Sequence, residues 1–299
     1  MDAREGLSTA RRDELLVGTA WLAERLQQPG IRIVDCRFYF DDYDRGRRAY
    51  LEGHVPGAVY LNWATDISEP RGDLQLMAPS PERFRAAMER LGIGDATTVV
   101  GYDDEGGHYV SRLWLILRRY GHDTLRLLEG GWTKWTHEGR PVRAGEEPPP
   151  PRATFTIRQE RPEVLVDAAG VLRRKDDPET VLVDVRRRSE FTGEEVRSRH
   201  GGHIPWAKWA FWQDNLDWEG ERDFRPLDAI RRRYEAAGIT PDKRVITYCH
   251  GAVRAAHSAL TLVLLGYPRV QVYDGSWEEW GSRDDLPIAT GEPPEAAPP

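Results

Sequence analysis

Cysteine is rare in this sequence, with 2 among 299 residues, Cys36 and Cys249. Two cysteines cannot form a disulfide framework, and without a cysteine cluster a structural zinc site has no ligands. No apolar run approaches the roughly 18 residues of a membrane-spanning helix, and the first residues lack the apolar stretch of a signal peptide. We therefore expect a cytoplasmic protein with no membrane association.

Positive charge is also in short supply. Lys and Arg number 42 against 49 Asp and Glu, which leaves a net charge of −7. Domains that bind nucleic acid carry a basic excess, so we expect no nucleic-acid partner. The balance still permits a local basic pocket.

What the sequence does contain is an internal repeat. Four segments return in the same order and at nearly constant spacing: residues 33–37 as 182–186, 52–56 as 201–205, 98–103 as 244–249, and 129–135 as 274–280. This period is far longer than that of a solenoid unit, so it indicates a duplicated domain. We predict an N-terminal domain over residues 12–144, a proline-rich linker over 145–162, and a C-terminal domain over 163–291.

Each copy alternates short apolar runs with amphipathic stretches. Residues 181–185 and 244–248 are β-branched and apolar, which is typical of buried parallel strands. Residues 227–237 and 255–265 are predicted helices, and the second is apolar on all sides. Strands and helices in alternation predict an α/β fold with a parallel sheet and helices on both of its faces.

Cys249 lies where the strand predicted over 244–248 ends and a loop leads to a helix. Ligands of open parallel sheets bind at this edge. Loop N–H groups can form an anion-holding nest, and the positive end of the following helix adds to it. Both effects favour the thiolate, so Cys249 is the candidate nucleophile. The candidate active-site loop consists of His250, Gly251, Ala252, Val253 and Arg254.

The first copy has Asp103 where the second has Cys249. An aspartate cannot supply a thiolate, so we expect the first domain to be structural and to close one side of the pocket. Asp104, Glu105 and His108 follow, and a metal site there is the alternative interpretation. Cys36 aligns with an apolar residue of the second copy, which favours a packed thiol.

These motifs resemble those of the tandem rhodaneses, the thiosulfate and 3-mercaptopyruvate sulfurtransferases. The likeness extends over about residues 15–291 and rests on residues 184–186, 202–205, 249–254 and 274–280. It implies two tandem rhodanese-like domains, of which only the second keeps an active cysteine. It also implies that no metal or organic cofactor is needed.

The resemblance implies a sulfurtransferase that carries sulfane sulfur as a Cys249 persulfide. Thiosulfate is the expected donor, and a thiophilic acceptor such as cyanide, a small thiol or a protein thiol takes the sulfur. Three alternatives stay open: a 3-mercaptopyruvate enzyme, a cysteine-dependent phosphatase or arsenate reductase, and a non-enzymatic sulfur carrier or regulatory module. Phosphatases space cysteine and arginine as C-x5-R, whereas four residues separate Cys249 from Arg254 here.

The donor is harder to predict because the sequence departs from both family patterns. Where thiosulfate enzymes usually have basic residues after the cysteine, this chain has His250, a titratable imidazole, and Gly251. Mercaptopyruvate enzymes usually have serine at the position of Gly251. Glu190 stands where both groups tend to have an arginine, and we expect its carboxylate to repel anionic donors. Arg254 then becomes the candidate cation for the donor, provided that it points inward.

Two further departures concern shape. Ala252 replaces a usual glycine, and if its backbone needs a positive φ the alanine costs about 1 kcal/mol. Trp206 replaces another glycine and begins a tryptophan-rich segment, which is either a wall of the pocket or a contact between the domains. Three residues are expected to support the loop. Asp184 and Asp274 would accept loop N–H groups, and Arg186 would buttress the loop or a neighbouring carboxylate.

Overall fold

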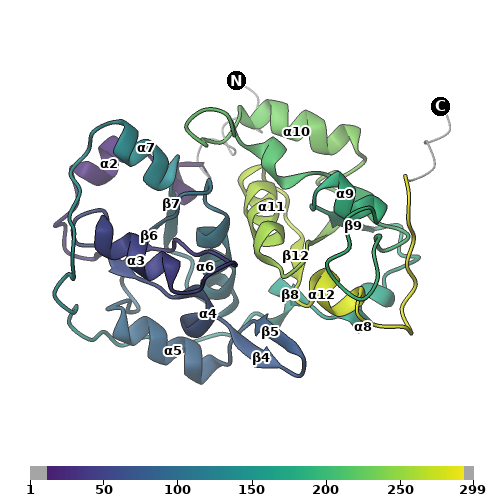
Figure 1. Cartoon of the computed structure of the whole chain (residues 1–299), viewed down its shortest axis with the longest axis horizontal. Helices are drawn as coiled ribbons and strands as arrows, with labels where there is room; N and C mark the ends of the chain where they lie inside the picture. The colour runs from purple at the N-terminus through teal and green to yellow at the C-terminus, as the bar shows by residue number, and fades with distance from the viewer. Residues whose placement is uncertain (1–11, 293–299) are drawn as a thin grey trace.

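The structure is a computed structural model that describes residues 12–292. It contains two five-stranded parallel sheets, one in each half of the chain, with helices on both faces of each (Figure 1). Within residues 12–292 no helix is long and apolar enough to cross a membrane. The first residues of the chain, on which the expected lack of a signal peptide rests, lie outside this range.

The first half contributes a parallel sheet, a small antiparallel hairpin and six helices to the described part of the chain. In order, these elements are β1 (Leu16–Val17), α2 (Thr19–Ala23), β2 (Ile31–Asp35), α3 (Arg45–Glu52), β3 (Val59–Tyr60), α4 (Trp63–Asp66), β4 (Glu69–Arg71), β5 (Leu74–Met77), α5 (Pro81–Arg90), β6 (Thr98–Tyr102), α6 (His108–Arg119), β7 (Leu125–Leu128) and α7 (Gly131–His137).

The second half repeats this plan without the hairpin. Its elements are η1 (Pro162–Val164), β8 (Leu165–Val166), α8 (Ala168–Leu172), β9 (Thr180–Asp184), α9 (Arg188–Thr192), β10 (Lys208–Trp209), η2 (Trp212–Asn215), α10 (Leu227–Ala236), β11 (Arg244–Tyr248), α11 (Val253–Leu264), β12 (Val270–Tyr273) and α12 (Ser276–Trp280).

The two sheets have equivalent strand orders, which agrees with the duplication. The first is β1-β7-β6-β2-β3, and the second, read from the same end, is β8-β12-β11-β9-β10. The central strand is β6 in one sheet and β11 in the other. A central parallel strand is covered on both faces, so its residues are apolar on both sides. Val245 and Ile246 of β11 accordingly belong to different core clusters.

The predicted elements of the second copy agree closely with the observed ones. The strand predicted over 244–248 is β11, and that over 181–185 is β9, which begins one residue earlier. Helix α11 begins at Val253, two residues before the prediction. Ala252 precedes it in a left-handed conformation, and the chain turns directly from that residue into the helix.

The halves meet mainly through α6 and α11, which pack against each other. Ten of the 12 residues of each helix are buried, as expected for helices covered on all sides. A buried ion pair adds a polar contact: Arg112 of α6 lies 2.7 Å from Asp274, which also accepts the N–H of Ala78 at 2.9 Å. The two halves are thus joined by both apolar and charged contacts.

The proline-rich segment between the halves packs along the first one. Residues 144–161 contain no helix or strand. The Phe155 side chain is only 2% exposed and makes an edge contact with Phe84, with ring centroids 5.6 Å apart. The N–H of Thr156 donates to Asp95 at 2.7 Å. This connector has no regular secondary structure and is held by the first half.

Candidate active site

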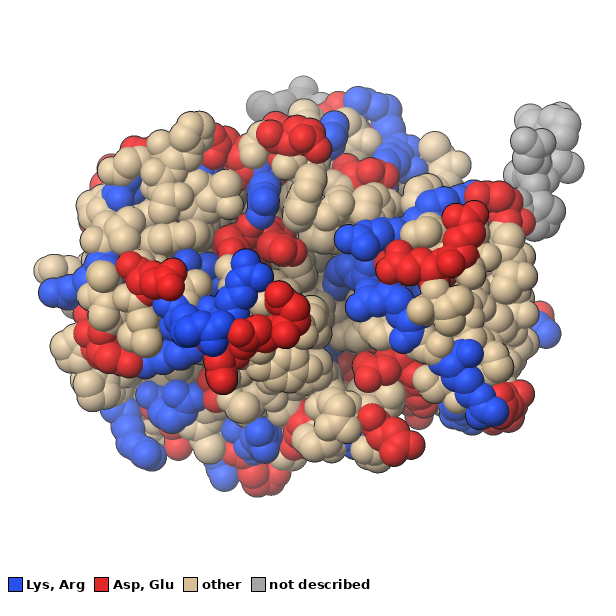
Figure 2. Space-filling view, viewed as in Figure 1, with Lys and Arg blue, Asp and Glu red and all other residues tan. Residues whose placement is uncertain are grey.

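Cys249 lies at the carboxyl end of β11, next to a cavity of about 750 Å³ between the two halves. Its side chain is 1% exposed, so only the cavity reaches the sulfur. The space-filling view shows a hollow between the halves, with basic side chains gathered on its wall toward the C-terminal half (Figure 2). Both halves line the cavity, with Phe40, Tyr43, Gln75, Leu76, Glu105, His108, Tyr109, Arg187, Glu195, Arg197, Trp212, Gln213, Cys249, His250, Gly251, Val253, Arg254 and Glu278.

The start of α12 holds the cysteine in place. The Cys249 N–H donates to the Ser276 hydroxyl at 3.2 Å, and the Trp277 N–H donates to the Cys249 carbonyl at 3.0 Å. The Glu278 N–H donates to the His250 carbonyl at 2.9 Å. Ala252 has a positive φ of 59°, a backbone conformation that is strained for alanine. The loop is therefore a tight, pinned turn.

The equivalent loop of the first copy shows what such a turn binds. Asp103 is fully buried, and its carboxylate accepts four backbone N–H groups at 2.8–3.1 Å, from Glu105, Gly107, Tyr109 and Val110. The N-terminus of α6 and its loop thus enclose a carboxylate. In the second copy Cys249 directly follows β11, as Asp103 directly follows β6 in the first. Within residues 12–292 no three acidic, histidine or cysteine side chains are grouped as a metal site would need.

The Arg254 side chain lines the cavity. Its guanidinium donates two hydrogen bonds to the Glu190 carboxylate, at 2.6 and 3.0 Å. Glu190 is 1% exposed and also lies 3.4 Å from Arg197. Burial alone would raise the pKa of Glu190. The hydrogen bonds and charge of Arg254, and to a lesser degree the charge of Arg197, outweigh burial and lower this pKa to about 2. Glu190 is therefore a charged carboxylate that two guanidinium groups share, and its repulsion of an anionic donor stays a prediction.

His250 is not a cation at neutral pH. Burial, with the charges of Arg197 and Arg254 adding to it, lowers its pKa to about 4. The positive charge of the cavity comes instead from Arg254, Arg197 and Arg187. Arg199, the other arginine of this segment, pairs with Asp284 at 2.8 Å and does not line the cavity.

Among the groups that the first half adds to the cavity wall are a carboxyl and an imidazole, Glu105 and His108. Burial, with the neighbouring carboxylates Asp103 and Asp104, raises the pKa of Glu105 to about 7. Burial lowers the pKa of His108 to about 3, so this imidazole is neutral. The sequence indicated Glu105 only as part of an alternative metal site, whereas the structure places it on the wall of the cavity that Cys249 lines.

The residues expected to support the loop have structural contacts. Arg186 binds Asp184 through two nitrogens and donates to the Gly202 carbonyl at 2.7 Å, so it does buttress a neighbouring carboxylate. Arg37 and Asp35 repeat this pair in the first half, which has no cysteine. Asp184 accepts the N–H of Arg186 rather than one of the 249–254 loop.

Asp274 also differs from its expected role. It bonds to Arg112 and to the Ala78 N–H, both in the first half, and to no N–H of the 249–254 loop. Sequence reasoning could not find these partners because they come from the other domain. Asp274 therefore links the two halves, two residues before Ser276, whose hydroxyl accepts the Cys249 N–H.

The tryptophan-rich segment was expected to form either a wall of the pocket or a contact between the domains, and its members differ in this respect. Trp212 lines the cavity and contacts His108 of the first half, with ring centroids 5.0 Å apart. Trp206 takes neither role, because it packs on Trp280 within the second half at 5.8 Å. Cys36 is fully buried, in agreement with a packed thiol.

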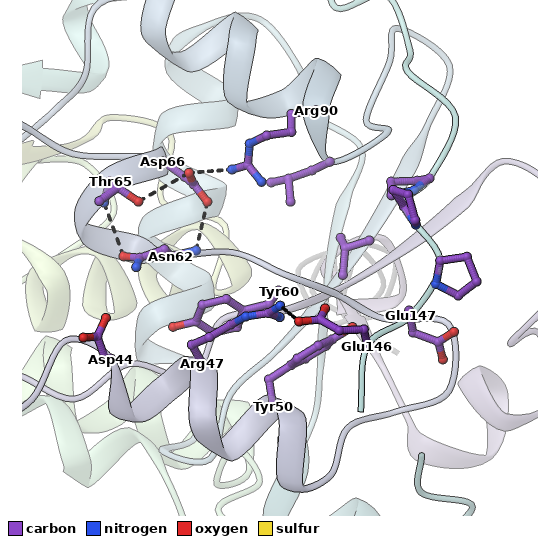
Figure 3. Close-up of a pocket in the computed structure, with 15 residues that line it drawn as sticks. Asp44, Arg47, Tyr50, Tyr60, Asn62, Thr65, Asp66, Arg90, Glu146 and Glu147 are labelled. Atoms are coloured by element: carbon purple, nitrogen blue, oxygen red, sulfur yellow. Dashed lines mark hydrogen bonds and ion pairs between the residues drawn. The ribbon is translucent and has the colours of Figure 1, made fainter. Parts of the chain in front are cut away.

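Another cavity, of about 710 Å³, lies on the first half beside the linker (Figure 3). Arg90 pairs there with Asp66 at 2.5 Å, and Arg47 pairs with Glu146. Both arginines of this cavity are thus neutralised by carboxylates of its own wall. It contains no nucleophile comparable to Cys249, so the interdomain cavity is the better candidate.

Comparison with known proteins agrees with this geometry. The family model for the rhodanese-like domain matches residues 18–138 and 167–283 of this chain. The chain is 37% identical to "Sulfur carrier protein TtuD" of Thermus thermophilus, over 93% of this chain and 98% of the relative. It is 34% identical to the thiosulfate sulfurtransferase of Bos taurus, over 90% and 92%.

A solved structure is similar throughout. The crystal structure of the 3-mercaptopyruvate sulfurtransferase SseA from Escherichia coli superposes with a TM-score of 0.78 and 30% identity, over 88% of this chain and 98% of that one. Two matched domains, full-length relatives and the predicted fold all agree. The chain therefore belongs to the rhodanese family and is a tandem-domain rhodanese sulfurtransferase.

Proposed function

We propose that Cys249 carries the transferred sulfur in a double displacement. Its thiolate attacks the outer sulfur of thiosulfate, the S–S bond of the donor breaks, and sulfite leaves with the electron pair. The enzyme then holds a Cys249 persulfide. A thiophilic acceptor attacks the terminal sulfur, and the Cys249 thiolate is restored. The balance closes without a metal or an organic cofactor.

The single observation that carries this proposal is the position of Cys249. It lies at the end of the central strand β11, and its loop leads into α11 and opens on the interdomain cavity. The corresponding loop of the first half encloses the negatively charged group of Asp103 with four N–H groups. A thiolate and a terminal persulfide are negative as well, so a related cradle supports both.

Thiosulfate as donor is supported by the arginines of the cavity. Arg254, Arg197 and Arg187 line it, and one buried carboxylate, Glu190, offsets part of their charge. Three nitrogen-bound hydrogens of Arg254 remain beyond its two bonds to Glu190, since a guanidinium has five. 3-Mercaptopyruvate, also an anion, is the second candidate, because the similar Escherichia coli structure is of a 3-mercaptopyruvate enzyme.

For the acceptor we propose a thiol, with cyanide as its substitute in assays. The name of the Thermus thermophilus relative, a sulfur carrier protein, supports a protein thiol among the partners. We further propose that residues 163–291 form the catalytic domain, that residues 12–144 close the cavity, and that the protein acts in the cytoplasm without a nucleic-acid partner.

Thiocyanate formation from thiosulfate and cyanide tests the assignment of Cys249. The wild type should turn over with ping-pong kinetics, and Cys249→Ser should show no turnover while unfolding at the wild-type temperature. Cys36→Ser is the matched control and should keep its activity. Appreciable turnover by a folded Cys249→Ser variant would refute the role of this residue.

A further inference from the structure

A second crevice between the halves lies away from the catalytic cavity. It has a volume of about 670 Å³ and is closed on one side by the β4–β5 hairpin. The hairpin reaches from the first half toward β8, α8 and α12 of the second (Figure 1). No residue lines both cavities. The crevice is lined by Arg71, Leu74, Met77, Ala78, Arg119, Pro162, Glu163, Leu165, Val166, Asp167, Arg173, Arg174, Gln271, Asp274, Gly275 and Glu279.

Four arginines converge on this crevice: Arg71, Arg119, Arg173 and Arg174. Among residues 12–292, none of the four has a carboxylate within 4.0 Å of its guanidinium, unlike most arginines of the protein. Arg71 donates to the carbonyl of Ala78 at 3.3 Å, and Arg174 donates to that of Gly170 at 2.8 Å. Their positive charge is therefore not neutralised by direct ion pairs.

The acidic residues of the crevice are mostly engaged elsewhere. Asp274 pairs with Arg112, and Glu279 lies 3.7 Å from Arg283, so the cations for both come from outside the lining. Asp167 caps α8 by accepting the Gly170 N–H at 2.7 Å. Glu163 is the remaining acid. The four arginines thus exceed the acids that are left to balance them.

Two buried polar atoms of the lining have neither a hydrogen-bond partner nor an ion pair in the described chain: Nε of Arg119 and Oε1 of Gln271. Oδ1 of Asp274 also lacks a hydrogen bond but is ion-paired with Arg112. Buried polar groups are nearly always satisfied, so an unsatisfied donor and an unsatisfied acceptor in one lining point to a ligand.

We propose that this crevice binds a phosphate-bearing small molecule at a site separate from the catalytic cavity. Guanidinium groups bind phosphate oxygens through paired hydrogen bonds, and four of them suit a multiply charged anion. The free amide oxygen of Gln271 suits a hydroxyl or N–H group on the organic part. A volume of about 670 Å³ accommodates a ligand of nucleotide size.

The site lies close to the catalytic machinery along the chain. Asp274 lines the crevice, and Ser276, two residues later, accepts the Cys249 N–H. The ligand would thus contact the segment that clamps the cysteine, without entering its cavity. This placement makes thiosulfate a useful competitor, because it should not displace a ligand bound in the crevice.

Calorimetric titration of the full chain with AMP and, separately, with pyrophosphate tests the proposal. We expect one site, whose affinity falls at least about tenfold in Arg71→Ala and in Arg174→Ala, since each removes a charge-assisted contact from a different wall. Arg85→Ala, an exposed α5 arginine outside the crevice, is the charge-matched control and should bind as the wild type does. Tighter AMP binding would indicate a monoester with an organic part, and tighter pyrophosphate binding a polyphosphate group.

Two results would overturn the proposal. One is no binding of either probe at millimolar concentration by folded wild-type protein. The other is binding that thiosulfate displaces and that Arg197→Ala abolishes while Arg71→Ala and Arg174→Ala leave it intact, because the probe would then occupy the catalytic cavity. Neither result depends on the proposed sulfur donor, so failure here is distinguishable from failure of the proposed function.

Discussion

Replacing Glu190 with glutamine tests the buried cluster that holds Arg254. The change preserves the size of the side chain and removes one negative charge. The Glu190 side chain is 1% exposed, and its carboxylate accepts two hydrogen bonds from Arg254. The pKa of Glu190 is lowered from 4.5 to about 2. That difference corresponds to about 3 kcal/mol of stabilisation of the charged form in the folded protein. At pH 7 we therefore expect Glu190→Gln to reduce the free energy of unfolding by about 3 kcal/mol.

The effect should depend on pH with a defined sign. A carboxyl whose pKa is lowered by folding stabilises the protein above its ordinary pKa, and this contribution is lost as pH falls toward the folded pKa. The difference between wild type and Glu190→Gln should thus be constant above about pH 5 and shrink as pH falls from 4.5 toward 2. Glutamine does not titrate, so Glu190→Gln lacks this pH-dependent contribution to the free energy of unfolding.

Urea unfolding at several pH values measures both expectations. Glu194→Gln, an exposed neighbour in the same segment, is the matched control and should change the free energy of unfolding by less than about 0.5 kcal/mol. Equal stability of Glu190→Gln and wild type at pH 7 would refute the reasoning. So would a difference that stays the same down to pH 3.

Two further predictions concern the donor. Arg254→Ala should raise KM for thiosulfate more than for a neutral organic trisulfide, because only the anion loses a charge partner; an equal rise for both would argue against an anion-holding role. The pKa of about 7 at Glu105 means that rising pH adds a negative charge to the cavity, so KM for thiosulfate should increase severalfold from pH 6 to pH 8. Glu105→Gln should flatten this dependence, and an unchanged profile would assign the titration to another group.

Much of the fold follows from local sequence patterns. Residues 245–248 of β11 are all buried and are all β-branched or aromatic, so the limits of this strand were predictable. Arg186 was expected to buttress the loop or a neighbouring carboxylate, and it binds Asp184 as Arg37 binds Asp35 in the first copy. Features that are repeated in the chain were thus the most reliable guide.

Long-range pairing was not predictable from these patterns. Glu190 and Arg254 are 64 residues apart and come from α9 and α11. From the sequence, Glu190 was therefore expected to act as a repulsive charge and Arg254 as a cation for the donor, and not as partners. Asp274 was expected to bind the nearby loop, but its partners Arg112 and Ala78 belong to the other half. Such contacts depend on how the two halves are packed, which a single sequence does not encode locally.

The start of α11 illustrates a smaller discrepancy. The helix was predicted from residue 255, but Ala252 takes a left-handed conformation with a φ of 59° and lets the helix begin at Val253. Alanine rarely adopts this conformation, so the only indication of it in the sequence was the resemblance, in which glycine is usual at this position. The result brings Arg254 into the first turn of the helix, where it reaches Glu190.

Intact-mass measurement of the reduced protein tests the central claim most directly. After incubation with thiosulfate, and separately with 3-mercaptopyruvate, we expect a gain of one sulfur atom that maps to Cys249 and disappears on addition of cyanide. The donor that loads the protein more completely identifies its preferred substrate. A gain that maps to Cys36, or no gain from either donor while Cys249 stays open to alkylation, would contradict the proposed persulfide mechanism.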